Sequence, residues 1–251
     1  MSEAILQVEK LRKNFGGLAA TDDVDLEVRR GELVAIIGPN GAGKTTLINL
    51  LTGVYPCDSG AIRFQGEDVT SLPVYSRSLR GLARSFQITS VFPEMTVLEN
   101  VAIAAQAHHG HSYRFWHKVA QNKEILDAAR ATLADLGMQA HPGRPAAMLA
   151  HGEKRVLEIA MALVTGPKML LLDEPMAGLG VEESRKMITF IQTLKGKLTI
   201  LLIEHDMEAV FALADRILVL ASGAIVASGP PEQIKTDPRV KLAYLGDDED
   251  A

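Results

Sequence analysis

The segment with the clearest chemical meaning is glycine-rich and spans residues 38–45. It reads Gly-Pro-Asn-Gly-Ala-Gly-Lys-Thr and matches the pattern G-x-x-x-x-G-K-[ST] in full. Because glycine has no Cβ, backbone N–H groups of such a loop can converge on a phosphate, and a helix beginning there adds partial positive charge. Lys44 can reach the β- and γ-phosphates, and Thr45 can ligate Mg²⁺. We therefore expect a site for a nucleoside triphosphate with Mg²⁺. The expected contact residues are Gly38, Pro39, Asn40, Gly41, Ala42, Gly43, Lys44, Thr45 and Thr46.

Polar residues follow two further apolar runs, at the point where each run ends. Asp173 and Glu174 come directly after residues 169–172, and His205 follows residues 198–203 through a single residue. If both runs are parallel strands, their ends lie at the sheet edge that carries the phosphate loop. We expect Asp173 to hold Mg²⁺, Glu174 to act as general base toward water, and His205 to contact the γ-phosphate and orient the water or Glu174. These residues predict hydrolysis in addition to binding.

The apolar patterning predicts the elements that position these residues. Two segments alternate with period two, as half-buried strands do, and three unbroken apolar runs are typical of buried strands. Strands separated by crossover helices indicate a parallel sheet, and helical patterns dominate from about residue 89 to 166. The expected strands are 5–11, 24–28, 32–37, 169–172 and 198–203, with a hairpin of 217–220 and 224–227; the expected helices include 45–52, 99–107, 123–136 and one that begins near Val181.

Bulk composition limits the classes of protein to consider. The chain has 251 residues, 47% hydrophobic and 23% charged, which is enough for one large α/β domain with an insertion. Its formal net charge of −5 gives no overall attraction to nucleic acid. Cys57 is the single cysteine, so an internal disulfide is impossible, which fits a reducing cytosol. Charges interrupt residues 1–30, and no stretch approaches the ~20 apolar residues that cross a bilayer. We therefore expect any membrane role to be peripheral, through a partner.

The sequence resembles the nucleotide-binding subunits of ABC transporters along nearly its whole length. Residues 38–45 and 170–175, Leu-Leu-Leu-Asp-Glu-Pro, look like the two Walker motifs of that family. The resemblance implies ATP and Mg²⁺ as ligands and an α/β P-loop NTPase core with a parallel sheet, an antiparallel β subdomain and an inserted helical subdomain. It implies one ABC ATPase domain, with residues 1–88 and 165–251 as the nucleotide-binding core and residues 89–164 as the helical subdomain with the signature segment.

Three more segments have counterparts in that family. Phe15 lies where the family places an aromatic ring that stacks on adenine, and Gln87 resembles the glutamine that joins the core to the helical subdomain and touches Mg²⁺ or the attacking water. Residues 149–153, Leu-Ala-His-Gly-Glu, lie where the family signature, usually Leu-Ser-Gly-Gly-Gln, is found. The resemblance implies that two subunits pair head to tail and that each signature covers the ATP held by the other. The covering residues would be Ala150, His151, Gly152 and Glu153.

The sequence departs from the family pattern at three positions. Ala150 replaces the signature serine and removes a hydroxyl donor, and a hydrogen bond to a charged group contributes roughly 1.5–3 kcal/mol. His151 replaces a glycine, and Gly180 stands where many members carry an aspartate that links the two sites. A different partner subunit could therefore complete one of the two sites, so both a homodimer and a heterodimer stay open.

Several segments look like the ATPases of branched-chain amino acid importers, whose relatives include urea and short-chain amide importers. The segments are residues 81–87, 92–101, 158–163, 203–207 and 243–246. The resemblance implies integral membrane permease subunits as partners, an indirect link to a solute-binding protein, and a peripheral position on the cytoplasmic face of the membrane. Four histidines lie in residues 108–117, and we favour a surface loop there over a metal site.

Two other classes of protein are alternatives to a transport ATPase. A soluble ABC ATPase acting on DNA or ribosomes usually has long coiled-coil insertions or two ATPase domains, and the sequence has neither. A small-molecule kinase or a GTPase could share the phosphate loop. The signature-like segment and His205 argue against both, and the Asn-Lys-x-Asp guanine motif does not occur.

Overall fold

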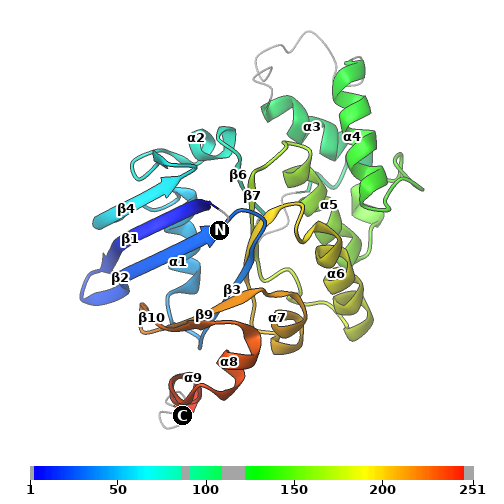
Figure 1. Cartoon of the computed structure of the whole chain (residues 1–251). Helices are drawn as coiled ribbons and strands as arrows, with labels where there is room; N and C mark the ends of the chain where they lie inside the picture. The colour runs from blue at the N-terminus through cyan, green and yellow to red at the C-terminus, as the bar shows by residue number, and fades with distance from the viewer. Residues whose placement is uncertain (1–2, 86–90, 109–121, 246–251) are drawn as a thin grey trace.

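The computed structural model describes residues 3–85, 91–108 and 122–245 (Figure 1). Its centre is a six-stranded sheet with the order β10-β9-β3-β8-β7-β6. β3, β6, β7, β8 and β9 are parallel, and β10 joins β9 as an antiparallel hairpin. The parallel core and the hairpin predicted from the sequence are thus both present. The strands are β3 (Leu33–Ile37), β6 (Leu82–Arg84), β7 (Met169–Asp173), β8 (Thr199–Ile203), β9 (Arg216–Ala221) and β10 (Ala224–Gly229).

A second, antiparallel sheet lies beside the first. Its order is β2-β1-β4-β5, and it corresponds to the expected antiparallel β subdomain. The alternating residues predict its first two strands because one face is buried and the other meets solvent. β4 and β5 were not predicted. The strands are β1 (Ala4–Phe15), β2 (Leu18–Arg29), β4 (Ser59–Phe64) and β5 (Glu67–Asp68), and the short helix α2 (Val74–Leu79) follows.

Helix α1 (Lys44–Thr52) packs between the two sheets (Figure 1). Its apolar residues, among them Leu47 and Leu51, are fully buried in one cluster with side chains of β1, β2, β3 and β4. The helix ends at Gly53, whose left-handed φ of 81° suits a helix C-cap. This packing fixes the start of α1 at the carboxyl end of β3.

Helices cover the opposite face of the six-stranded sheet. Alternate residues of the buried strands point to this face and form a second cluster with α5, α6 and α7. A third cluster joins α3, α4 and α5, so the helical part has its own apolar core. The division into residues 1–88 with 165–251 and residues 89–164 stays a prediction. The helices are α3 (Val97–His108), α4 (Lys123–Asp135), the 3-10 turn η2 (Ala146–Met148), α5 (His151–Leu163), α6 (Val181–Leu194), α7 (Met207–Leu213), α8 (Pro231–Thr236) and α9 (Pro238–Leu245).

None of the helices in the described part of the chain is both long and apolar enough to cross a membrane.

Candidate functional site

The phosphate loop connects β3 to α1 and is packed tightly against its neighbours. A Cβ on Gly38 would lie 2.0 Å from the carbonyl oxygen of Leu220, and one on Gly43 would lie 2.2 Å from that of Ala20. Only glycine fits at these two positions. At Gly41, by contrast, a Cβ would meet no atom within 4 Å. The loop is therefore anchored at its ends and open at its middle, as a phosphate cradle requires.

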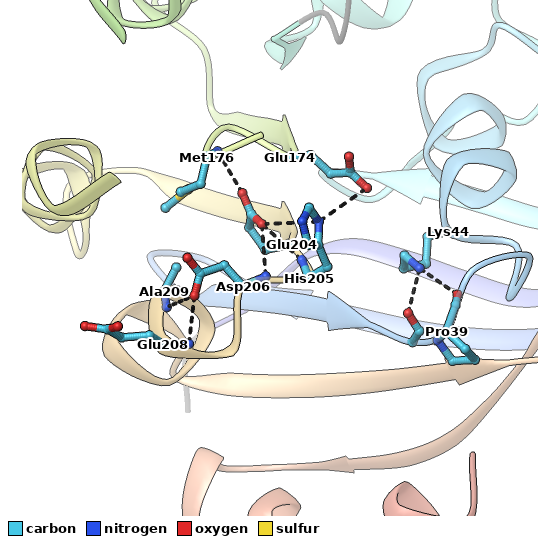
Figure 2. A network of polar contacts seen from close by, with 10 residues as sticks. Pro39, Lys44, Glu174, Met176, Glu204, His205, Asp206, Glu208 and Ala209 are labelled. Carbon is cyan, nitrogen blue, oxygen red and sulfur yellow. Dashed lines mark hydrogen bonds and ion pairs between the residues drawn. The ribbon is translucent and has the colours of Figure 1, made fainter. Parts of the chain in front are cut away.

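Lys44 begins α1 and turns its amine back across the loop. Its Nζ donates to the carbonyl oxygens of Gly38, at 2.7 Å, and Pro39, at 2.8 Å (Figure 2). The side chain is buried, and Gly43, the N-cap residue, gives the first turn of α1 no side-chain cap. The cation and the backbone N–H groups are thus placed together at the start of a helix, where a phosphate group is favoured.

Asp173 ends β7 at the same edge of the sheet and is 1% exposed. Its Oδ2 accepts a hydrogen bond from Nη2 of Arg84 at 2.9 Å, and Nη1 of Arg84 donates to Oδ1 of Asn49 at 2.7 Å. Asn49 belongs to α1, so Arg84 links the carboxylate to the helix that carries the phosphate loop. The exposed Thr45 lies in the first turn of this helix. A carboxylate and a hydroxyl are the oxygen donors that Mg²⁺ prefers, so this donor set fits the predicted metal.

Glu174 follows Asp173 in the left-handed region, with φ of 47°. A non-glycine residue there costs roughly 1–3 kcal/mol, and such strain gathers at functional sites. The backbone N–H of Glu174 donates to the carbonyl oxygen of Ile203 at 2.9 Å, which ties this turn to the end of β8. The Oε1 of Glu174 lies 3.9 Å from Nδ1 of His205, a side chain that is 64% exposed (Figure 2). The structure therefore brings the predicted base and histidine together at the edge that carries Lys44.

Glu204, between β8 and His205, lies beneath this pair and is 1% exposed. Its Oε1 accepts from the backbone N–H of Met176 at 2.8 Å, and its Oε2 accepts from the N–H groups of His205 at 3.0 Å and Asp206 at 3.3 Å. Burial raises the pKa of Glu204, although these hydrogen bonds act in the other direction. Sequence reasoning gave Glu204 no role. The sequence does contain a clue to such a role: a carboxylate that directly follows a buried apolar strand needs hydrogen-bond donors nearby.

Phe15 ends β1 and is 45% exposed. Its ring meets Tyr55 edge to face, with centroids 5.6 Å apart and planes at 75°, and Nζ of Lys13 lies 5.6 Å from the ring centroid. Tyr55 comes just after α1, so the aromatic pair connects the antiparallel sheet with the phosphate-loop helix. Tyr55 was not predicted. An exposed ring held from its edge has a face available for stacking.

The signature-like segment lies at the start of α5. The carboxylate of Glu153 accepts from the backbone N–H of Ala150 at 2.8 Å and caps the helix. The exposed His151 lies beside Gly178, where a Cβ would be 3.4 Å from its Nε2. α5 and α1 pack on opposite faces of the six-stranded sheet. Within one chain, the segment and the phosphate loop are therefore apart.

Two predictions fall partly or wholly outside the described residues. Gln87 lies there, and so does the histidine-containing segment apart from His108, the last residue of α3. Among the residues that the structure describes, no group of three or more His, Cys, Asp or Glu side chains could hold a metal ion.

Comparison with known proteins shows which families and proteins the sequence is similar to. The family model described as "ABC transporter" matches residues 21–177, and the one described as "Branched-chain amino acid ATP-binding cassette transporter" matches residues 224–250. The chain is 42% identical to the high-affinity branched-chain amino acid transport ATP-binding protein LivG of Escherichia coli (strain K12), over 98% of this chain and 100% of that protein. It is 40% identical, with the same coverage, to the corresponding protein BraF of Pseudomonas aeruginosa.

Solved structures of ATP-binding cassettes are similar to this chain over nearly its whole length. The ADP conformation of MJ1267, an ATP-binding cassette of an ABC transporter, superposes with a TM-score of 0.87 at 32% identity, over 98% of this chain and 100% of that one. A nucleotide-free cassette from an ABC transporter gives a TM-score of 0.86 at 34% identity, over 96% and 99%. The phosphate loop, the acidic edge of the sheet and these similarities agree: the chain belongs to the ABC transporter family, as an ATP-binding cassette.

Proposed function

We propose that the chain binds ATP with Mg²⁺, hydrolyses it, and thereby powers import of branched-chain amino acids through membrane permease subunits. The observation that carries the hydrolytic part is the meeting of Glu174 and His205 at the sheet edge that holds Lys44 and Asp173. The names of the relatives support the transported solute and the permease partners. Residues of this chain do not select the solute in this proposal.

Binding uses the phosphate loop and the aromatic pair. The Lys44 amine exchanges its two loop carbonyls for phosphate oxygens, and the N–H groups at the start of α1 contact the same phosphates. Asp173 and Thr45 would hold Mg²⁺, with Gln87 as a further contact to the metal or the water. Bound Mg²⁺ neutralises charge that develops on the phosphate oxygens. The face of Phe15 stacks on adenine.

Hydrolysis uses Glu174 as general base. A water oxygen attacks the γ-phosphorus, the bond from that phosphorus to the bridging oxygen breaks, and ADP leaves with the bridging oxygen. The carboxylate of Glu174 accepts the water proton. The exposed His205 contacts the γ-phosphate and keeps Glu174 and the water aligned.

The complete site needs a second ATP-binding subunit, which is a copy of this chain or a related one. Residues Ala150, His151, Gly152 and Glu153 of one subunit then cover the ATP held by the other. The placement of α5 and α1 on opposite faces of the sheet supports this pairing, because one chain alone does not bring its own two segments together.

Uptake in a strain that lacks the gene for this chain tests the whole proposal. Restoring the wild-type gene is expected to restore leucine uptake, and the Glu174→Gln gene is expected not to. Restored uptake of urea without leucine would overturn the proposed solute. Retention of an integral membrane protein when the tagged chain is purified from membranes tests the permease partner, and repeated failure to retain one would contradict it.

A further inference from the structure

We propose that Glu204 is a positioning residue for hydrolysis: its buried carboxylate holds the turn after β7 and the start of the segment after β8 in one geometry. The turn carries Glu174, and the second segment carries His205. The inference rests on the proposed ATP hydrolysis and adds a residue to it that touches neither nucleotide nor water.

The contacts of Glu204 connect the two strand ends directly. One carboxylate oxygen accepts from Met176, two residues beyond Glu174, at 2.8 Å. The other accepts from His205 at 3.0 Å and Asp206 at 3.3 Å. All three donors are backbone N–H groups, so the carboxylate restrains the chain path of both segments (Figure 2). A second bond between these segments, from the N–H of Glu174 to the carbonyl oxygen of Ile203 at 2.9 Å, lies next to it.

The three backbone N–H groups require a hydrogen-bond acceptor at both terminal atoms of the residue 204 side chain. An ionised carboxylate accepts through both oxygens and donates nothing, which matches three converging N–H groups. A glutamine in the same place has an acceptor at one end only. Its amide N–H groups at the other end would face backbone donors and push one segment away. The isosteric change therefore tests the hydrogen bonds without changing the volume of the side chain.

The burial of the Glu204 carboxylate costs folding stability, so a role in positioning can be distinguished from a role in stabilising the fold. The raised pKa of Glu204 means that the folded protein favours the neutral side chain more than the unfolded chain does. A neutral side chain there removes the desolvation penalty while it loses hydrogen bonds. We therefore expect Glu204→Gln to stay folded at the assay temperature and yet to hydrolyse slowly.

The turn held by Glu204 continues toward the proposed contact with a second subunit. After Met176 the chain passes Gly178, which lies beside His151, and reaches Gly180 at the start of α6. A shift of this turn would therefore move Glu174 and a segment near the signature together. Glu204 lies at the fixed end of that turn.

Steady-state hydrolysis by the full chain, alone and with its membrane partner, tests the proposal. Glu204→Gln is expected to lower kcat about 10- to 100-fold, as displacement of a reacting group by about 1 Å does. The KM for ATP is expected to stay within about threefold, because the phosphate loop is unchanged. Glu32→Gln is the matched control: Glu32 is a partly buried glutamate at the opposite edge of the sheet, paired with Arg216 at 2.7 Å. This control is expected to lower the melting temperature and leave kcat unchanged.

The possible results of these assays distinguish a failure of this inference from a failure of the proposed function. A wild-type protein without ATPase activity in either form would overturn the function. A hydrolysing wild type with an unaffected Glu204→Gln, or a variant whose kcat falls only in step with its folded fraction, would overturn the inference alone. Amide hydrogen exchange of the wild type gives a second measurement that needs no variant. Slow exchange at Met176, His205 and Asp206 is expected, and exchange at the rate of exposed turns would contradict the proposed bonds.

Discussion

At the scale of single residues, the amine of Lys44 is hydrogen-bonded to the loop that we propose binds phosphate. Its two carbonyl partners, at 2.7 and 2.8 Å, keep the buried amine satisfied when no anion is present. The side chain is thus confined beside the loop, which limits the entropy lost when the amine exchanges these carbonyls for phosphate oxygens.

Lys44→Ala is expected to weaken ATP binding at least about tenfold, because hydrogen bonds to charged groups contribute roughly 1.5–3 kcal/mol. Titration of a fluorescent ATP analogue measures the affinity. Lys197→Ala removes an exposed lysine just before β8, at the far edge of the sheet, and is the control. Equal affinity in both variants would show that Lys44 does not contact the nucleotide.

Arg84 is the ion-pair partner of Asp173, the residue that we propose as a Mg²⁺ ligand. With Asp173 1% exposed, the guanidinium at 2.9 Å is the compensating charge for a buried carboxylate. Mg²⁺ would supply the same compensation, so Arg84 and the metal offer alternative partners to one carboxylate.

Arg84→Ala is expected to lower the free energy of unfolding by about 3 kcal/mol in EDTA, because it leaves Asp173 buried without a countercharge. ATP with Mg²⁺ should recover more stability in this variant than in the wild type. Thermal unfolding with and without ligand measures both effects. Arg185→Ala, which breaks the exposed pair of Arg185 with Glu182, should change neither value. Equal recovery in variant and wild type would contradict the exchange of partners.

At the scale of elements, the start of β3 is fixed to the start of β9 at the edge opposite the site. Glu32 accepts from Nε of Arg216 at 2.7 Å and from the backbone N–H of Arg29 at 2.9 Å. Burial acts to raise the pKa of Glu32, but the hydrogen bonds from Arg216 and Arg29 outweigh it and lower the pKa below the ordinary value. The bonded carboxylate therefore stabilises the strand that delivers the phosphate loop.

The sign of this shift sets a pH dependence. Because the folded pKa lies below the unfolded one, the stabilisation is present above the ordinary glutamate pKa of about 4.3 and is lost as pH falls through the folded pKa. Glu32→Gln is expected to cost about 1–2 kcal/mol at pH 7 and progressively less below about pH 4. Urea unfolding of both proteins across this range measures the difference. A difference independent of pH would show that the charge of Glu32 is not involved.

At the scale of the whole molecule, the two segments that we propose to complete an ATP site lie on opposite faces of one sheet. The chain supplies a phosphate loop on one face and a signature-like segment at the start of α5 on the other. A head-to-tail pair would close both proposed sites at once, and we expect Ala150 to influence how tightly they close.

Ala150→Ser restores the hydroxyl donor that the family signature usually carries, and is expected to stabilise the ATP-bound dimer about tenfold. Sedimentation of the Glu174→Gln background with ATP and Mg²⁺ measures the dimer. Ala147→Ser, an exposed change in η2, is the control. If the two serines have equal effects, Ala150 does not face the nucleotide of a partner.

The sequence predicted what depends on local pattern and left out what depends on tertiary contact. The phosphate loop, the buried strands and the hairpin follow from residue types within a few positions, and the structure confirms the strands and the hairpin. Arg84 reaches Asp173 across 89 positions, and Glu204 reaches Met176 across 28. Such pairs exist only once strand order is set, so spacing along the chain did not reveal them. The edge-to-face contact of Phe15 with Tyr55 is of the same kind.

Single-turnover hydrolysis by Glu174→Gln tests the central claim most directly. With the carboxylate replaced by an amide of the same shape, the protein is expected to bind ATP with Mg²⁺ at wild-type affinity, to form an ATP-dependent dimer, and to release ADP at least about 100-fold more slowly, because the general base is gone. Release of ADP at the wild-type rate from a protein that remains monomeric with ATP would contradict both the role of Glu174 and the paired site.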